Sequence, residues 1–271
     1  MASSKILLKI PPRDEEALTG SEFAKYLATI PPEERDKAIY SEIISGNIPS
    51  FLRKFVKIET VGVDLNGERH RVAYWVLPDY LSIGSDRDFI RIPMTPQTAQ
   101  RIADQLNCLL PTKKIVDDIW RHATVKLHPQ PIDVGKYDIT SPLIFLLHQM
   151  LIENQRRGKP LGELTAGHKK DVVITNRLIE KPGRVAIYGW HYPDGKPIQP
   201  LSTVHHVSYY DYSHGIRLVK NTVLVDNTKI TLESLLKDKV LCSLLSDEGA
   251  IHVTRYPYNI SQKVFKKKKR D

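Results

Sequence analysis

The chain has 271 residues, of which 41% are hydrophobic and 26% charged, proportions typical of a soluble globular protein with a sizeable core. No apolar run approaches the roughly 18 residues that a bilayer-spanning helix needs, so we expect no membrane span. The opening segment 1–12 has too few apolar residues for a signal-peptide core. We therefore expect a cytoplasmic protein, or a secreted or periplasmic one whose signal was removed.

The net charge of +9 is concentrated at one end, because residues 263–271 carry +5 of it. Such a run is typical of a solvated tail, and binding of nucleic acid through Lys263–Arg270 is possible in principle but not favoured. Cys108 and Cys242 lie in no Cys-x-x-Cys pattern, which excludes a thiolate zinc site and predicts two buried free thiols.

Local signals in the first part of the chain predict helices followed by a hairpin. Thr19 and Glu22 have capping-box spacing before an amphipathic stretch, and consecutive prolines after residue 30 open a second helix that stops near Gly46. The turn Asp64–Gly67 separates two β-rich runs. Strands are expected at 54–63, 68–77 and 89–92.

Helices return in the middle of the chain, and β signals dominate after it. Proline follows a capping Thr95 or Ser141 at two helix starts, and Thr112 opens a third helix. We expect helices at 97–107, 113–123, 143–157 and 231–245, and strands at 171–175, 184–190, 204–210, 215–219, 222–225 and 250–254.

This order predicts an α+β fold, with N-terminal helices and a hairpin, a helical middle, and a mixed or antiparallel sheet in the C-terminal half. The expected organisation is a helical segment 1–50, a single α+β domain 51–262 and a basic tail 263–271.

Five of the ten histidines fall within 47 residues of this β-rich half, beside three aspartates. Imidazole readily exchanges a proton, or offers a neutral nitrogen to a metal, near pH 7. The group comprises His168, His191, His205, His206 and His214, with Asp171, Asp194 and Asp211. We therefore expect a chemical site at strand ends between residues 168 and 217.

In one interpretation a histidine oriented by an aspartate acts as general acid or base, with Ser213 or a cysteine from elsewhere as nucleophile. Arg217 would hold a substrate carboxylate, and Trp190 and Tyr210 would form a stacking wall for it. The candidate catalytic residues are His168, Asp171, His191, Ser213 and His214.

In a second interpretation the ligands His191, His205, Asp211 and His214 bind zinc or another divalent metal, which generates a hydroxide nucleophile. His205 and Asp211 are six positions apart, which on a strand keeps them on one face, and no HExxH motif is present. A third interpretation is structural, with histidines on sheet faces hydrogen-bonded to carboxylates.

The segment Ser213–Leu218, SHGIRL, resembles the end of the L,D-transpeptidase catalytic motif, in which Ser/Thr-His-Gly-Cys is followed by a hydrophobic residue and Arg or Asn. His191 resembles the upstream histidine of that family. Ile216 stands at the place of the nucleophilic cysteine, so a transpeptidase activity would need another cysteine. The residue types also resemble those of D-alanyl-cleaving cell-wall metallopeptidases. The phrases LPDYLSIGSD, AGHKKDVV and DYSHGIRLV resemble an uncharacterised bacterial protein family, which implies no particular activity.

These observations predict a hydrolase or acyl-transferase with a His/Asp-rich site, with or without a bound metal, acting on a small molecule or a peptide of the peptidoglycan type. The alternative is a non-enzymatic protein that binds an anionic polymer, nucleic acid or polysaccharide, through the basic tail and an aromatic, histidine-rich face.

Overall fold

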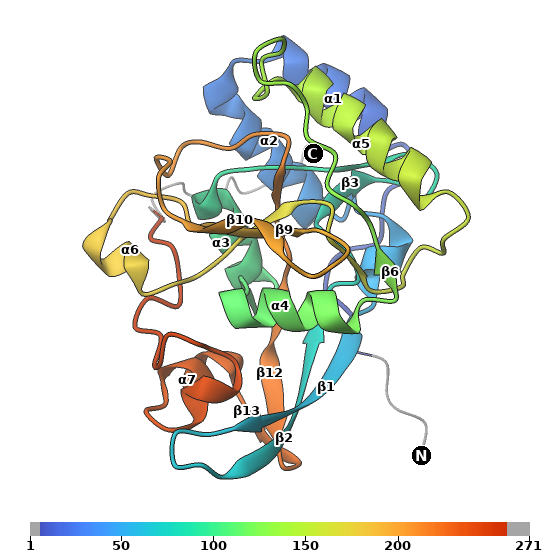
Figure 1. The fold of residues 1–271 in the computed structure, drawn as a ribbon. Coiled ribbons are helices and arrows are strands. Elements are labelled where there is room, and N and C mark those ends of the chain that lie inside the picture. The colour runs from blue at the N-terminus through green and yellow to red at the C-terminus, as the bar shows by residue number, and fades with distance from the viewer. Residues whose placement is uncertain (1–5, 259–271) are drawn as a thin grey trace, which may run out of the picture.

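The computed structural model describes residues 6–258 and has the predicted α+β fold (Figure 1). The N-terminal helices α1 (Gly20–Thr29) and α2 (Pro32–Ser45) form where the sequence predicts them. Thr19 begins α1 with both hydrogen bonds of the capping box. Gly46 ends α2 with a φ of 98°, a left-handed conformation that glycine adopts without steric cost.

A five-stranded sheet occupies the lower part of the view in Figure 1. Its order is β1-β2-β12-β13, with β5 also paired to β12. The β1–β2 hairpin turns at Asp64–Gly67 as predicted, and the Asp64 carboxylate accepts the amides of Asn66 and Glu68, each at 2.9 Å. The strands are β1 (Val56–Val63), β2 (Arg69–Val76), β5 (Cys108–Leu109), β12 (Val219–Val225) and β13 (Thr228–Ile230).

A smaller, four-stranded sheet of order β10-β9-β8-β11 carries most of the predicted site residues. Strands β8 and β11 are parallel, and the other pairs are antiparallel. In Figure 1, α4 lies between this sheet and the larger one. The strands are β8 (Lys170–Val172), β9 (Ile187–His191), β10 (Pro197–Ser202) and β11 (His214–Gly215).

Helices cover both sheets, and α1 packs along α5 at the top of Figure 1. The helices predicted after Thr95, Thr112 and Ser141 are confirmed as α3, α4 and α5. The remaining helices are α3 (Pro96–Gln105), α4 (Lys113–His122), α5 (Pro142–Arg156), α6 (Arg177–Glu180) and α7 (Leu232–Lys237), with 3-10 turns at Ser50–Arg53 and Leu241–Leu244. Two-stranded pairs are formed by β3 (Ser82–Gly84) with β4 (Phe89–Arg91), and by β6 (Val125–Lys126) with β7 (Thr165–Ala166).

Four predicted elements are wrong. The strand expected at 215–219 is interrupted at residues 216–218, which lie between β11 and β12. Residues 204–210 form turns, and His206 makes only an isolated bridge to Arg184. The predicted helix 231–245 stops at the end of α7, because the Asp238 carboxylate accepts the amides of Val240 and Leu241 and so competes with helical hydrogen bonds. Residues 250–254 form irregular chain.

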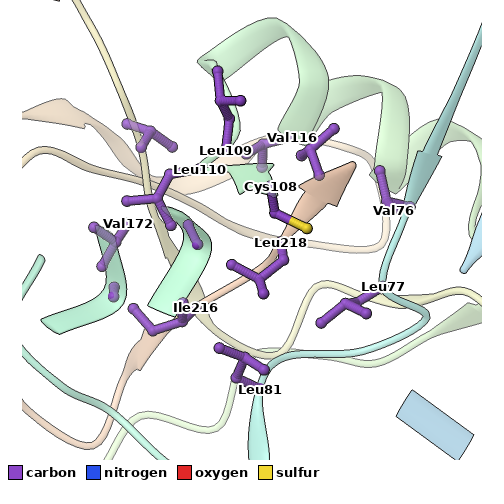
Figure 2. Close-up of a cluster of buried hydrophobic side chains, with 14 of the residues drawn as sticks. Val76, Leu77, Leu81, Cys108, Leu109, Leu110, Val116, Val172, Ile216 and Leu218 are labelled. Carbon is purple, nitrogen blue, oxygen red and sulfur yellow. The ribbon is translucent and has the colours of Figure 1, made fainter. Parts of the chain in front are cut away.

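One hydrophobic cluster joins the N-terminal helices to both sheets. Figure 2 shows Ile216 and Leu218, from the segment between β11 and β12, among core side chains of both sheets and of α4. Cys108 and Cys242 are buried and unbridged, as predicted. Within residues 6–258 there is no helix with the length and apolar character needed to cross a bilayer.

Candidate functional site

Strand β8 places two sets of side chains on opposite faces of the smaller sheet. Because successive side chains of a strand alternate, Asp171 and Lys170 point to different faces. The register pairs Asp171 with Tyr188 of β9, and Lys170 with His214 of β11. These two sides are named the Asp171 face and the Lys170 face below.

The alternation of β9 is interrupted at Gly189 and Trp190, whose φ angles are 109° and 58°. A left-handed conformation at a non-glycine residue costs on the order of 1–2 kcal/mol, and such strain concentrates at functional sites. As a result the Trp190 ring lies beneath Lys170, whose Nζ is 5.0 Å from the ring centroid. His191 instead joins Tyr188 on the other face.

On the Asp171 face, His191 belongs to a cluster around Asp117 of α4. The Asp117 carboxylate accepts hydrogen bonds from the Tyr188 hydroxyl at 2.7 Å and pairs with His191 Nε2 at 3.2 Å, and Lys113 Nζ lies 3.4 Å from it. Burial opposes ionisation of Asp117, but the bonds from His191 and Tyr188 leave its pKa below the ordinary value. The cluster around Asp117 holds the His191 imidazole in place, and the hydroxyl group in this cluster is the phenol of Tyr188, which is buried.

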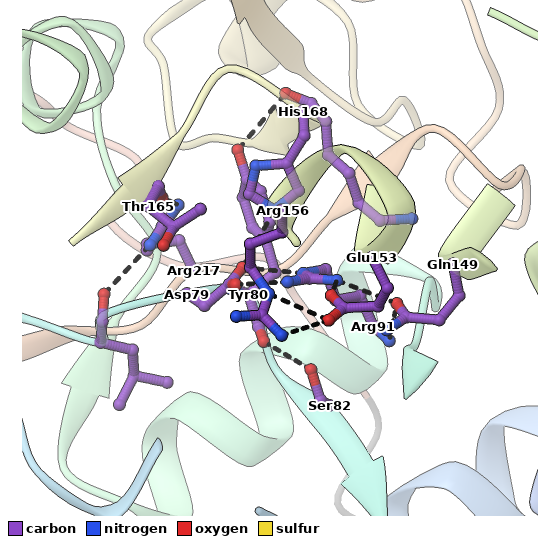
Figure 3. Close-up of polar contacts among 12 residues, drawn as sticks. Asp79, Tyr80, Ser82, Arg91, Gln149, Glu153, Arg156, Thr165, His168 and Arg217 are labelled. Carbon is purple, nitrogen blue, oxygen red and sulfur yellow. Dashed lines mark hydrogen bonds and ion pairs between the residues drawn. The ribbon is translucent and has the colours of Figure 1, made fainter. Parts of the chain in front are cut away.

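Beneath the same face lies a buried ion network (Figure 3). Arg91 donates two hydrogen bonds to Asp79, at 3.0 and 2.7 Å, and one to Glu153 of α5 at 2.7 Å. His168 Nε2 contacts Asp79 at 3.0 Å. Burial opposes the charge on Asp79, yet Arg91 and His168 hold its pKa well below the ordinary value. Burial lowers the pKa of His168 to about 4, so its ring is neutral. This network joins β4 to α5.

Tyr80 links the network to Asp171, because its hydroxyl donates to the Asp171 carboxylate at 2.8 Å. Burial raises the pKa of Asp171 to about 6. The Arg217 guanidinium lies 4.2 Å from the Tyr80 ring centroid and donates to the carbonyls of Leu77 and Thr165 (Figure 3). Arg217 is completely buried. It therefore joins three segments of the fold rather than facing a substrate, contrary to the predicted role.

A second polar group, named the Asp211 cluster, lies on and beside the Lys170 face. Its Asp211 carboxylate accepts the Ser213 hydroxyl at 2.5 Å, the Ser213 amide at 2.8 Å and the Tyr209 hydroxyl at 2.9 Å. Lys169 Nζ donates to the Tyr212 carbonyl, in the peptide that precedes Ser213. The cluster consists of Lys169, Lys170, Tyr209, Asp211, Ser213 and His214.

Burial sets the charges of this cluster. It lowers the pKa of Lys169 to about 7, with Arg91 adding to the effect. It lowers the pKa of His214 to about 4, although Asp211 acts in the opposite direction. Burial also opposes ionisation of Asp211, but His214 and Ser213 leave its pKa below the ordinary value. Near neutral pH the cluster thus holds a carboxylate, a neutral imidazole and a partly deprotonated amine. Titratable groups shifted in this way concentrate at functional sites.

His214 has no hydrogen-bond partner for either ring nitrogen within the described part of the chain, although only 1% of the residue is exposed. A buried polar group without a partner costs about 1–3 kcal/mol and is uncommon in folded proteins. Its neutral imidazole keeps a free lone pair, so it has the chemistry of a general base.

Tyr209 separates the cluster from a surface cavity of about 500 Å³ between α2 and residues 208–210. The Tyr209 ring stacks on the exposed His205 ring at 4.2 Å and meets His214 edge-on at 5.8 Å. Tyr210 also lines this cavity, and its ring packs against Phe145 of α5. A molecule bound there would reach the cluster once the Tyr209 ring moves aside.

The structure therefore divides the predicted catalytic residues between two faces. His168, Asp171 and His191 lie on one side of β8, whereas Ser213 and His214 lie on the other. Trp190 lies under Lys170, Tyr210 lines the cavity, and the exposed His206 imidazole bonds Ser208.

The four predicted metal ligands do not converge. His205, Asp211 and His214 surround Tyr209, but His191 lies across the sheet against Asp117. Over residues 6–258 there is no group of three or more His, Cys, Asp or Glu side chains arranged to hold a metal ion. The residues present therefore do not fit the predicted four-ligand site. Asp194 pairs with Lys196 at the surface, and the basic tail 263–271 lies outside the described residues.

Sequence reasoning missed Lys169, Tyr209 and Asp117 as site residues. Lys169 and Lys170 lead directly into the apolar strand DVV, but nothing in this pattern separates a buried lysine from a solvated one. For Asp117 no local signal exists, since its partner His191 is 74 positions away.

Comparisons of the chain with protein-family models, curated proteins and solved structures found no significant match. The resemblances of SHGIRL to L,D-transpeptidases, and of longer phrases to a bacterial family, thus remain likenesses of short segments. Ile216, at the place of the transpeptidase cysteine, is fully buried, as are Cys108 and Cys242.

Proposed function

We propose that this protein is a hydrolase or acyl-transferase whose reaction takes place at the Asp211 cluster, with the Ser213 hydroxyl as nucleophile. The observation that carries the proposal is His214, a neutral, fully buried imidazole without a hydrogen-bond partner in residues 6–258, next in sequence to a serine bound to a carboxylate. An unsatisfied buried imidazole beside a serine and a carboxylate calls for an explanation, and a role in chemistry is the one that we propose.

In this mechanism Ser213 Oγ attacks the carbonyl carbon of an ester or amide, and the hydroxyl proton passes to a neutral base of the cluster. The leaving alcohol or amine takes a proton back, which leaves an acyl-serine. Water then releases the acyl group as an acid, or an acceptor amine takes it in a transfer reaction. Asp211 accepts the hydroxyl and orients it. The neutral forms of Lys169 and His214, neither of which bonds this hydroxyl in the structure, are the two bases that we propose take the proton once substrate is bound.

Access to Ser213 requires a local movement, because the residue is almost fully buried. Tyr209 is the side chain that separates it from the cavity, and it is only half-buried. The substrate class we propose is a peptide of the bacterial cell wall, which rests on the resemblance of SHGIRL and of the histidine and aspartate types to cell-wall enzymes.

The first test uses a fluorophosphonate probe, which phosphonylates activated serines and adds a known mass. We expect one modification, mapped to Ser213 by peptide mass spectrometry, and its loss in Ser213→Ala. Ser45→Ala, an exposed serine at the end of α2 outside this cavity, is the matched control and should label like the parent. Absence of labelling, or full labelling of Ser213→Ala, contradicts the proposal.

The pH dependence of labelling identifies the base. If Lys169 takes the proton, the rate rises with pH through about 7, and Lys169→Met abolishes it. If His214 does, the rate rises near pH 4 and is flat through neutrality, and His214→Gln abolishes it. A rate independent of both substitutions contradicts the assignment of Lys169 or His214 as the base.

A metal-assisted version of the reaction remains a separate prediction, tested by elemental analysis of untagged protein purified without chelator. About one zinc, iron or manganese per chain, lost in His214→Ala or His191→Ala, would restore the metal-assisted mechanism, which the arrangement of residues 6–258 does not support. The alternative function, binding of an anionic polymer, predicts salt-dependent binding that collapses when residues 263–271 are deleted.

A further inference from the structure

The cavity between α2 and residues 208–210, named the Tyr209 cavity here, has an acidic and aromatic lining. Three carboxylates and one guanidinium give the lining a formal charge of −2, and the rings of Tyr209 and Tyr210 form part of its wall. Carboxylates and aromatic rings together suit the side chain of a lysine or arginine. The charged lining residues are Glu33, Arg35, Asp36 and Asp138.

Two of these carboxylates accept their hydrogen bonds from neutral groups. Asp138 accepts the hydroxyl and the amide of Thr140, at 2.7 and 3.0 Å, and these bonds, aided by the charge of Arg35, hold its pKa below the ordinary value. Asp36 lies deeper and accepts the hydroxyls of Thr95 and Thr98, and burial raises its pKa.

The basic side chains around the cavity have partners of their own. Arg35 donates to the carbonyls of Leu27 and Thr140, at 3.2 and 3.3 Å. Lys136, two positions before Asp138, pairs with Asp133 at 3.9 Å. Arg101 of the neighbouring α3 stacks on a tyrosine ring of α2. The exposed carboxylates Glu33 and Asp138 are therefore open to a further cation.

The described chain ends beside this cavity. Its last residues run along α3 toward the N-terminus of that helix, because the Tyr256 amide donates to the Gln100 side chain and the Gln97 side chain donates to the Pro257 carbonyl, each at 3.3 Å. Thr95, which caps the N-terminus of α3, lines the cavity. The backbone at 256–257 thus approaches the end of α3 that borders the Tyr209 cavity.

The sequence that follows is basic and long enough to enter the cavity. Residues 259–271 lie outside the described residues, and their first lysine, Lys263, comes five positions after Tyr258. Five residues span at most about 18 Å and eight at most about 29 Å, whereas Gln97 and Thr95 are only two positions apart. A short link within one chain gives an effective concentration in the mM range, so even a weak site is occupied.

We infer that the Tyr209 cavity binds the chain's own basic segment 263–271, with lysine side chains paired to Glu33 and Asp138. In that position the segment covers Tyr209, the side chain that separates the cavity from the Asp211 cluster. One consequence rests on the proposed function, namely that the segment and a substrate compete for the cavity. The binding itself does not depend on that reaction.

Binding of a peptide to the full chain tests the inference. The probe is a fluorescein-labelled peptide with the sequence of residues 259–271, followed by anisotropy at low ionic strength. The comparison is a full-length variant that carries Lys266→Gln, Lys267→Gln, Lys268→Gln and Lys269→Gln. The parent should bind the peptide at least about tenfold more weakly than this variant, because its own segment fills the cavity. Absence of binding to the variant, or equal affinity for both chains, overturns the inference.

Further substitutions in the glutamine variant locate the site. Glu33→Gln and Asp138→Asn should each weaken peptide binding several-fold. The matched controls are Glu34→Gln, next to Glu33 on α2, and Asp133→Asn, in the same loop as Asp138, neither of which is among the lining residues. All four positions are exposed, and far-UV circular dichroism checks that the variants are folded. Controls that weaken binding as much as the cavity variants overturn the inference. Because binding is measured, the result stands whether or not Ser213 proves to be a nucleophile.

Discussion

Replacing Lys169 with methionine should stabilise the protein near neutral pH. The side chain is almost completely buried, and its pKa falls from 10.5 to about 7, chiefly because of burial. A depression of that size corresponds to roughly 5 kcal/mol of unfavourable free energy when the unfolded lysine is protonated and the folded one must lose or bury its charge. Methionine is unbranched, of similar length and uncharged, so Lys169→Met removes this cost.

Part of the gain is offset because the variant loses the hydrogen bond from Lys169 to the Tyr212 carbonyl, which is worth about 1–3 kcal/mol when its partner is left buried. We therefore expect Lys169→Met to raise the free energy of unfolding by roughly 2–4 kcal/mol at pH 7, measured by urea denaturation.

The pH dependence gives the sharper assay. The folded pKa of Lys169 lies below the unfolded one, so between about pH 7 and pH 10.5 the unfolded state binds more protons and parent stability rises with pH. The variant lacks this contribution, so the difference between variant and parent should shrink by about 3 kcal/mol between pH 7 and pH 9.5.

Lys196→Met is the control, because that side chain is 83% exposed and its replacement should change stability by no more than about 0.5 kcal/mol. A Lys169→Met variant less stable than the parent at pH 7, or a difference that does not vary with pH, would refute the reasoning. If the proposed reaction uses Lys169, the more stable variant is also inactive. Such a result is common where a functional group is buried in surroundings that disfavour its charge and therefore lowers stability.

Three further substitutions test other parts of the fold. Asp79→Asn leaves the buried Arg91 with its charge poorly compensated and should lower the unfolding free energy by roughly 3–5 kcal/mol in urea titrations; near-parent stability would contradict a paired role. Gly215→Ala places a methyl group 2.6 Å from the Tyr80 ring and should cost about 1–3 kcal/mol, seen as a lower melting temperature. His70 has its pKa raised by two aspartates, so its contribution is full below the unfolded pKa and is lost as pH rises through the folded one. The melting-temperature gap between parent and His70→Gln should therefore be larger at pH 6 than at pH 9, and an equal gap would count against the ion pairs.

Elements whose ends are set by neighbouring residues were predictable. The capping box at Thr19, the Asp64 turn and the caps at Thr95 and Thr112 satisfy backbone groups within a few positions, so the sequence alone specifies them. The α+β class follows from the same local signals.

The segment 204–210 shows where such reasoning stops. Its β-branched and aromatic residues match strand composition, but a strand also needs a partner with free backbone groups. β10 already pairs with β9 up to Ser202, and after it the chain turns, so that Tyr209 comes back over His214. The segment keeps two backbone bonds to the chain before β9, from the Val185 amide to the His205 carbonyl and from the Val207 amide to the Gly183 carbonyl, but it turns at residues 207–208 before a ladder forms.

The site itself depends on a backbone feature that residue patterns do not reveal. A regular β9 would send Tyr188 and Trp190 to one face and His191 to the other, the face on which His214 also lies, with β8 between the two histidines. The left-handed φ at Trp190 reverses this order, so His191 meets Asp117 and the indole meets Lys170. A bulky residue holds that conformation only when the surrounding packing compensates its strain. The backbone conformation of β9 thus places the histidines on two faces of the sheet. For this reason the reaction that we propose at the Asp211 cluster uses a serine, an imidazole and a lysine.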